Sequence, residues 1–424
     1  MRKLHQKNTV RYYILLVVLL LFLFVSGDFG MIDVQKTAII MAVGIDREDD
    51  TFIITSQIAV PQSSKQGKAT ETVELVSRGK TVADAFKEIN VKTGWYPKLV
   101  FCHLIVLGEK TVQKNAFDAL EFFILDEYMS DNCLVATCDG LAKDLLNVTA
   151  LIDPSGSVAI QKVLSPHAER AGTVAPSTLR EFAISYYSIG KSGYLPVVKT
   201  QPQQEKISGE ENSGGKTQNP SAQEGEQSKN SSGGSSGEQG GSSGSGKAGE
   251  SQGKEKPVFS ASETALFKNG KRVGTLTKEE TFAFNAVKGK LRLASYLVER
   301  KEGACTLTIK RNDPKIKISV SDDGRTSYRI SLRVTAGLLD NANAIYNQTI
   351  ADVGDVPEGA FTSAEKRLSA QIATTFEKCR ALQCDIFGVL EHLQKREHKK
   401  MEQLRFTAFE NTVLSVSVRF KNVR

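Results

Sequence analysis

The sequence predicts an α+β protein whose mixed sheets carry packed helices and follow an N-terminal hydrophobic helix. Three observations predict this fold. From residue 37 onward, runs with the two-residue period of strands alternate with runs of helical period. Glycine turns such as Asn269-Gly270 separate neighbouring strand patterns and indicate hairpins. Near the N-terminus, the residues from Tyr12 to Val25 form an unbroken apolar run.

The N-terminal segment is typical of an export signal. Its apolar run follows four basic residues, Arg2, Lys3, Lys7 and Arg11. Because positive charges stay in the cytoplasm, we expect everything after about Gly27 to lie outside. A lipoprotein would carry its lipidated cysteine where this chain has Asp28, so lipidation is excluded. Cleavage after Gly27 and retention as an uncleaved anchor both stay open, and we favour retention.

The 424-residue chain is long enough for two or three domains. Residues 201–256 are mainly Gly, Ser, Gln, Glu and Lys, with almost no apolar side chain. Such a segment cannot bury enough surface to offset its ordering entropy, so it predicts a disordered linker. The rest divides into an export signal or membrane anchor (1–33), an N-terminal α+β region (34–200) and a C-terminal α+β domain (257–424). A second subdomain beginning near residue 150 stays an alternative within the N-terminal region.

The expected elements of the N-terminal region begin with a hairpin of strands Thr37–Val43 and Thr51–Val60. They continue with a capped helix from Thr81 to Gly94, a buried strand Leu99–Leu107, a helix Val112–Leu125, a strand Cys133–Cys138, helical stretches within Ser157–Ser188 that break at Pro176-Ser177, and a strand Tyr194–Lys199.

The C-terminal domain is expected to begin with a hairpin of Thr264–Phe267 and Lys271–Leu276. Its further expected elements are a short helix from the capping box Thr277–Glu280, strands Cys305–Lys310, Ile316–Ser321 and Tyr328–Val334, a turn at Asp322-Asp323-Gly324, a helix from the capping box Thr362…Glu365 to about Leu382, a helix from Asp385 to about Leu404, and a final strand at 413–420.

We predict no catalytic, cofactor-binding or metal-binding residue, and expect the chain not to be an enzyme. His103 lies beside Cys102, but neighbouring strand residues point to opposite faces and cannot form a dyad. His392 and His398 are too far apart around a helix to share a ligand. The acidic turn residues Asp46, Asp49 and Asp50 are interpreted as solvated rather than cation-binding.

The six cysteines are too few for a disulfide framework in a chain of this length. Two pairs, Cys133 with Cys138 and Cys379 with Cys384, have C-x4-C spacing. No second pair or histidine cluster completes a zinc site, so we expect all of them to be buried as small apolar side chains.

Phosphate and nucleic-acid binding are not favoured either. The stretch Gly241–Lys247 approaches a phosphate-binding loop, but Ala248 follows it and no strand pattern precedes it. The net charge of +7 is spread among acidic residues, and the basic stretch Lys395–Lys400 fits a solvated helix face.

The order of motifs resembles the Ger(x)C family, the C subunits of nutrient germinant receptors in spore-forming Firmicutes. The resemblance covers nearly the whole chain outside the linker. Its most distinctive stretch is Cys384–Glu391, which is similar to the Asp-x-Phe-Gly sequence that opens the family's final helix. The other similar segments are Val34–Ile40, Val43-Gly44-Ile45-Asp46, Gly94–Leu99, Cys102–Glu109, Ala265–Lys268 and Gly274–Thr281.

The resemblance implies α+β domains on the outer face of the inner spore membrane, working with an A-type and a B-type membrane subunit. The nutrient ligand, unidentified, would bind elsewhere in that complex. This chain departs from the family in Asp28 and in its long linker, which implies looser coupling between the two halves. The alternative function is an extracytoplasmic, membrane-tethered solute-binding protein, although the antiparallel hairpins of the C-terminal half argue against it.

Overall fold

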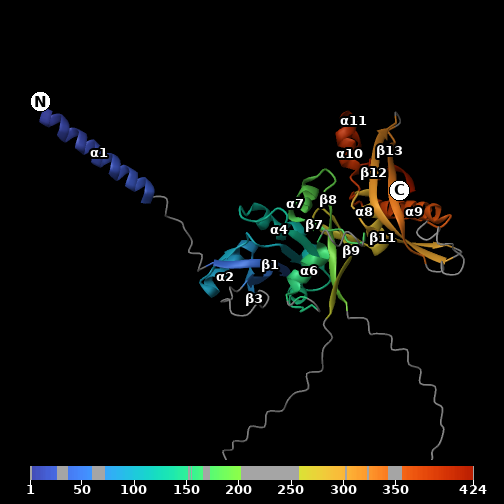
Figure 1. Cartoon of the computed structure of the whole chain (residues 1–424), viewed down its shortest axis with the longest axis horizontal. Coiled ribbons are helices and arrows are strands. Elements are labelled where there is room, and N and C mark those ends of the chain that lie inside the picture. The colour runs from blue at the N-terminus through green and yellow to red at the C-terminus, as the bar shows by residue number, and fades with distance from the viewer. Residues whose placement is uncertain are drawn as a thin grey trace, which may run out of the picture. The chain divides into compact units, whose positions relative to one another are not determined.

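The computed structural model describes residues 2–25, 37–59, 72–150, 153, 155–165, 172–201, 257–300, 303–321, 324–341 and 356–423. Two β-sheets with packed helices make up the folded part of the chain (Figure 1). Residues 1–201 and 257–424 belong to one compact unit. This mixed content of helices and sheets confirms the predicted α+β class.

Helix α1 covers Arg2–Val25, and its apolar side chains from Tyr12 to Phe22 are exposed. Among the residues searched, no helix combines the length and the apolar character that a membrane crossing requires.

The first sheet has the strand order β10-β9-β8-β6-β5-β1-β2-β3, with β4 beside β1 and β7 beside β6. Its central strands β8, β6, β5 and β1 run parallel, and the outer strands are antiparallel. The strands are β1 Thr37–Glu48, β2 Thr51–Ala59, β3 Thr72–Gly79, β4 Tyr96–Lys98, β5 Leu104–Leu107, β6 Leu134–Cys138, β7 Ser177–Thr178, β8 Ser192–Gln201, β9 Val258–Lys268 and β10 Lys271–Leu276.

Helices cover both faces of this sheet, which is why β5 is a continuous apolar run with every residue buried. One core contains α2, α4 and α7, and a separate core on the sheet contains α5 and α6. The helices of this part are α2 Val82–Thr93, α3 Glu109–Lys114, α4 Ala116–Leu125, α5 Ala142–Leu146, α6 Gly156–Leu164 and α7 Leu179–Tyr187.

The second sheet has the order β11-β12-β13-β14 and packs one face against helices. Strands β11 to β13 are antiparallel, and β14 joins β13 in parallel. Its elements are α8 Lys278–Val287, β11 Ala294–Arg300, β12 Gly303–Val320, β13 Thr326–Asn341, α9 Ala360–Ala381, α10 Val389–Arg396, α11 His398–Leu404 and β14 Val413–Asn422.

Several expected elements are confirmed with their end signals. Helix α2 starts at Thr81, whose hydroxyl accepts from the Asp84 N–H, and ends at Gly94 with a φ of 72°. Helix α8 begins with the complete capping box of Thr277 and Glu280. The β9–β10 turn has positive φ at both Asn269 and Gly270, as a type I′ hairpin requires.

Other expectations about element boundaries are wrong. The predicted helix Val112–Leu125 is two helices, because the Asn115 side chain accepts from the Phe117 N–H and starts α4. The predicted strand Leu99–Leu107 begins only at Leu104. Strand β11 was missed. The patterns 305–310 and 316–321 belong to the single strand β12, which ends at Val320.

The predicted capping box at Thr362 and the predicted helix from Asp385 are also wrong. Helix α9 begins after Gly359 without a side-chain cap, so Thr362 lies inside its first turn. Residues 385–388 precede α10 as a loop, and α10 and α11 divide at Glu397. The turn residues Asp322 and Asp323 and the expected linker from residue 202 lie outside the described residues.

The ends of the linker are adjacent in the first sheet. Strands β8 and β9 pair antiparallel from Ser192↔Lys268 to Gln201↔Val258. The segment between Gln201 and Val258 is therefore the connection of one β-hairpin. The expectation that the linker loosens the coupling between the halves is wrong, because the strands at its two ends hydrogen-bond to each other.

Candidate functional site: the interface between the two regions

The interface between residues 37–201 and residues 257–423 begins with the shared first sheet. Strands β9 and β10 follow the linker in sequence, yet they extend the sheet of the N-terminal region through β8. The second sheet packs on the other face of strand β9. Leu266 of β9 belongs to the core of the second sheet, whereas the next residue, Phe267, belongs to the core of the first sheet. The β8–β9 hairpin is thus the element that both regions share.

The loop at residues 384–388 fastens the C-terminal region to this hairpin. The Cys384 thiol donates to the Phe267 carbonyl at 3.2 Å, and the Asp385 N–H donates to the Ser192 hydroxyl at 3.0 Å. On its other side, the Tyr328 hydroxyl donates to the Phe387 carbonyl at 3.0 Å. The loop therefore bridges strands of both sheets.

The carboxylate of Asp385 organises this loop. One oxygen accepts from the N–H groups of Gly388 and Val389 at 2.8 and 2.9 Å, and the other accepts from Leu390 at 2.8 Å. These are the unpaired N–H groups at the start of α10, where a negative charge is favoured. Gly388 has a φ of 79°, a backbone region that glycine adopts without steric cost.

Asp385 is buried, and burial raises its pKa, while the three backbone donors oppose that shift. All three contacts use the carboxyl oxygens as acceptors, and such hydrogen bonds are stronger to an ionised carboxylate than to a neutral acid. The arrangement is that of a structural cap whose donors compensate for the loss of water.

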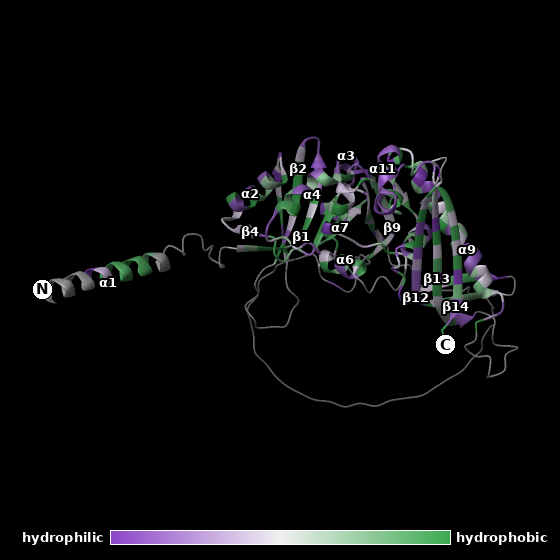
Figure 2. Cartoon of the chain, turned by 90° about the horizontal axis from the view of Figure 1, so that it is seen from above, coloured by the Kyte–Doolittle hydropathy of each residue, from purple (hydrophilic) through white to green (hydrophobic). Residues whose placement is uncertain are grey.

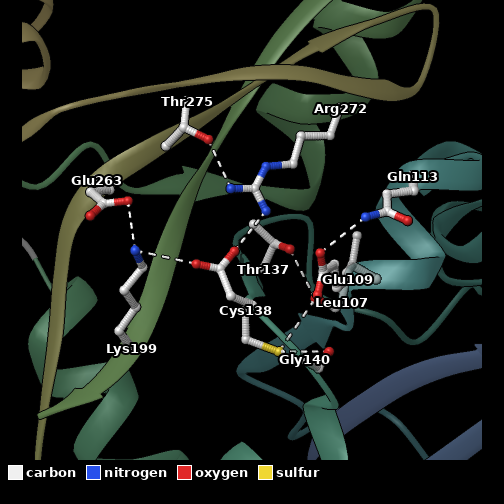
Figure 3. Close-up of polar contacts among 11 residues, drawn as sticks. Leu107, Glu109, Gln113, Thr137, Cys138, Gly140, Lys199, Glu263, Arg272 and Thr275 are labelled. Atoms are coloured by element: carbon white, nitrogen blue, oxygen red, sulfur yellow. Dashed lines mark hydrogen bonds and ion pairs between the residues drawn. The ribbon is translucent and has the colours of Figure 1, made fainter.

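A second set of contacts crosses the interface at the end of β6 (Figure 3). Asp139 accepts from Arg272 of β10 at 2.8 Å and pairs with Lys199 of β8 at 3.2 Å. Lys199 also pairs with Glu263 of β9 at 2.8 Å. Burial raises the pKa of Asp139, but the two cations outweigh burial and hold the pKa below its usual value. This network ties four strands of the first sheet together by charge.

A buried amide adds a third connection. The Asn285 side chain in α8 donates to the carbonyls of Gly172 and Val174 at 3.0 and 2.8 Å. These bonds attach the segment before α7 to helix α8 of the C-terminal region. Breaking them would leave the buried carbonyls of Gly172 and Val174 unpaired, which would cost stability.

The buried Asp46 at the end of β1 repeats the capping arrangement. Its two oxygens accept from the N–H groups of Ala142 and Lys143 at 2.7 and 3.0 Å, where α5 begins. Burial raises the pKa of Asp46, and these two donors oppose the shift. A Cβ atom at Gly108 would lie 2.0 Å from the Asp46 carboxylate, so only glycine leaves room for it. Asp46 is therefore a structural cap, whereas the sequence interpretation placed it in a solvated turn.

Two family descriptions match the chain and together cover most of it. Residues 30–200 match the spore germination protein N-terminal domain, and residues 262–424 match "Spore germination B3/ GerAC like, C-terminal". The chain belongs to the GerAC family of spore germination proteins. The first match ends just before the linker, and the second begins just after it.

Individual relatives of this GerAC-family chain match over shorter stretches. Spore germination protein A3 of Bacillus subtilis (strain 168) is 25% identical over 170 residues, which are 38% of this chain and 44% of that protein. Spore germination protein B3 of the same organism is 27% identical over 135 residues, 30% of this chain and 35% of that protein. The matched stretches span less than half of either relative. A crystal structure of the GerBC protein aligns with a TM-score of 0.49 at 16% identity, over 90% of this chain and 97% of that chain.

The cysteines of this GerAC-family chain lie inside the protein. All six are free and buried. Cys133 is hydrogen-bonded with Cys102 rather than with Cys138, and that bond together with burial raises its pKa. Burial raises the pKa of Cys384 to about 12, so its thiol is protonated near neutral pH and is a poor nucleophile.

The histidines and acidic groups form no metal cluster within the described residues. Burial lowers the pKa of both His103 and His392, which favours their neutral forms. The sequence interpretation had singled out Asp46 and the Asp385 motif, but not Ser192, Asp139 or Asn285. No local signal marks those three, because each finds its partner far away in the sequence.

Proposed function

We propose that this chain is a C-type subunit of a spore germinant receptor complex that acts through protein contacts rather than as an enzyme. The observation that carries the proposal is the match of its two halves to the N-terminal and C-terminal spore germination families. Its partners in the proposal are A-type and B-type membrane subunits, and the nutrient binds elsewhere in the complex. Residues 34–200 and 257–424 are the proposed folded regions on either side of the linker.

The proposed location is the outer face of the inner spore membrane. Helix α1 supports a membrane tether, because its basic start is followed by apolar side chains that remain exposed. Exposed leucine, valine and phenylalanine side chains on one segment gain free energy by leaving water. We propose that α1 is retained as the anchor of the mature protein.

An apolar groove beside the interface supports contact with another protein chain. It has a volume of about 600 Å³ and lies between α7, the end of α4 and α10. Two of its lining side chains are large, apolar and exposed: Ile184 is 59% exposed and Tyr187 is 70% exposed. Leu125, which follows the lining residue Ile124 in the sequence, is also exposed. Large apolar side chains in a groove suit a protein segment better than a polar nutrient. We propose that an extracytoplasmic segment of a receptor membrane subunit occupies it.

Co-purification from spore membranes tests this proposal. The tagged wild-type chain should retain the A-type and B-type subunits, and Ile184→Glu should lose them because it places a charge in the apolar groove. Val91→Glu is the matched control, since Val91 is an exposed apolar residue on α2, outside the groove. Retention of both subunits by Ile184→Glu would exclude the groove as the contact. Failure of the wild-type chain to retain either subunit would contradict the receptor assignment.

The solute-binding alternative is tested by titrating the full chain with amino acids and sugars in a calorimeter. The receptor proposal expects no tight binding of any nutrient to the isolated chain. Saturable binding of one nutrient, weakened by substitutions in a single pocket, would favour the alternative.

A further inference from the structure

The outward face of the second sheet is strongly basic. In β12, β13 and β14 alternate side chains point to opposite faces, and the even-numbered positions between 312 and 420 fill the core. The odd-numbered positions in 311–319, 327–335 and 413–421 form the opposite face, which we call the basic face. Its exposed cations are Arg311, Lys315, Lys317, Arg329, Arg333, Arg419 and Lys421. Figure 2 shows the resulting alternation of hydrophilic and hydrophobic residues along these strands.

The register places these cations side by side. Arg333 pairs with Arg419 across the parallel β13–β14 ladder, and Arg329 lies opposite Lys317 in β12. Like charges on directly opposed strand residues repel each other and destabilise a sheet. The sheet therefore bears a cost of repulsion that an external anion would relieve.

Among the residues that the structure describes, little negative charge balances this face. The only acidic residue at its outward positions is Asp313, which pairs with Arg311 at 2.8 Å and lies opposite Arg333 in the β12–β13 ladder. The other six cations form no ion pair with any described residue. The outward positions thus carry seven cations and one carboxylate. The formal net charge of the whole chain is only +7, so positive charge is concentrated on this face.

The remaining outward positions supply small hydroxyl groups. Ser331 and Ser417 lie next to each other between the cations, opposite Lys315. A groove of about 370 Å³ runs over this part of the face. It is lined by four cations and the two serines, and also by Leu332 and one carboxylate, Asp313; the cations are Lys315, Arg333, Arg419 and Lys421. Arginine and lysine are the side chains that bind phosphate oxygens, and serine hydroxyls donate to them as well.

We propose that the basic face docks on a membrane surface by binding the phosphate groups of anionic phospholipids. A bilayer presents many phosphates in one plane, so it can meet cations spread over three strands at once. A nucleic-acid partner is less suitable, because no aromatic side chain occupies the outward positions to stack on bases. The inference rests on the proposed tether, because a chain that is held at the membrane stays near its lipid headgroups.

The test uses the full chain in vesicles and measures how fast its lysines react with a membrane-impermeant acylating reagent, read by mass spectrometry. In vesicles that contain phosphatidylglycerol, Lys315, Lys317 and Lys421 should react several-fold more slowly than in pure phosphatidylcholine vesicles. Lys87 and Lys110 are exposed on the first region and should react at the same rate in both. Added salt should abolish the difference, since it screens exposed charges.

A double variant, Arg333→Gln with Arg419→Gln, separates lipid binding from other causes of protection. Each removed arginine should weaken the binding of the basic face to the membrane surface about fivefold, so most of the protection of the three lysines should disappear. The matched control, Lys87→Gln with Lys110→Gln, removes the same charge elsewhere and should keep the protection.

Three outcomes would overturn the inference. Equal reaction rates in the two kinds of vesicle would show that the face does not meet lipid. Protection in neutral vesicles as well would indicate that something other than anionic headgroups covers the face. Equal protection by soluble glycerol phosphate would indicate a site for free phosphate instead. None of these outcomes involves the receptor subunits, so the inference can fail while the receptor proposal stands.

Discussion

Asp46 and Asp385 stabilise the fold in the same way at two distant places. Each carboxylate is buried, and each accepts backbone N–H groups where a short helix begins. Both lie in segments that resemble family motifs, Val43–Asp46 and Cys384–Glu391. The motifs are therefore explained by local architecture, because removing the caps would leave two backbone donors at Asp46 and three at Asp385 without these acceptors.

Asp385→Asn should lower the free energy of unfolding by about 1–3 kcal/mol. The amide oxygen can still accept from Gly388 and Val389, but the amide nitrogen would face the Leu390 N–H, so two donors would oppose each other. Urea unfolding of the full chain in mild detergent measures the loss. Glu391→Gln on the same helix is the control, since its side chain is 58% exposed and should change stability by less than about 0.5 kcal/mol. An Asp385→Asn variant as stable as this control would refute the capping role.

The Asp139 network should make stability depend on pH. The pKa of Asp139 is lower in the folded chain than its ordinary value of 3.8, so its ionised form favours folding. That contribution is complete above about pH 3.8 and is lost as the pH falls through the folded-state pKa. Because Asp139 is 43% exposed, we expect Asp139→Asn to cost less than about 1 kcal/mol at neutral pH.

The measurement is the difference in unfolding free energy between the wild type and Asp139→Asn across the acidic range. The difference should shrink toward zero as Asp139 becomes protonated in the folded wild type. A difference that grows in acid would contradict the sign of this linkage.

At the level of residues, the sequence predicted types of contact better than partners. The Thr277–Glu280 capping box and the Asn269-Gly270 turn depend on neighbours in the chain and are confirmed. The bond from the Asp385 N–H to Ser192 joins residues 193 positions apart, and no local pattern marks it. Long-range polar partners are determined by how the elements pack together. The period of apolar residues along the sequence carries no information about that packing.

Among the elements, the β8–β9 hairpin has the largest consequence for the fold. It belongs to the first sheet, contributes Leu266 to the core of the second, and carries the linker at its end. Both strands were predicted, but their pairing was not, because a long polar segment separates them in sequence. The pairing also explains how the chain accommodates this segment: an insertion at a hairpin end leaves the hydrogen-bonded ladder intact.

Replacing residues 202–256 with a short glycine-containing turn should preserve the fold. It should raise the free energy of unfolding by up to about 2 kcal/mol, because closing a shorter loop costs less chain entropy. Urea unfolding and amide hydrogen exchange of β8 and β9 measure the effect. A scrambled segment of the same length is the control and should leave stability unchanged. Lost protection of β8 and β9 in the shortened chain would contradict the hairpin.

Errors in the predicted elements arise where the apolar period and the element boundary disagree. Helix Val112–Leu125 was read as one helix because its apolar period continues through Asn115, whose side chain nevertheless starts a new helix. Strand β12 was read as two strands because its polar middle interrupts the apolar pattern. That interruption belongs to the basic face, where alternation places charges outward on a continuous strand.

At the scale of the whole molecule, three features bear on the proposed receptor role: an exposed apolar helix, a groove beside the interface and a basic sheet face. The interface binds both folded regions through a shared sheet, the Asp385 loop and the Asp139 network. We therefore expect a force or a contact on one region to be transmitted to the other rather than absorbed between them. Such coupling suits a subunit that acts through protein contacts.

Retention of α1 is tested by the intact mass of the chain extracted from membranes. We expect a mass that includes residues 1–27. The apolar side chains exposed along α1 gain free energy by leaving water, so the retained helix can serve as the anchor. A chain that begins at Asp28 would contradict retention and would leave attachment to the basic face or to partner subunits.

Nutrient-triggered germination of spores that lack this chain tests the central claim most directly. Spores of the deletion strain should fail to release dipicolinate in response to the nutrient of this receptor, and a plasmid copy of the wild-type gene should restore the release. Dipicolinate release triggered without nutrient should remain normal, because the proposed role of this chain is confined to the response to nutrient. Normal responses of the deletion strain to every nutrient that activates the parent would contradict the assignment of this chain as a germinant receptor subunit.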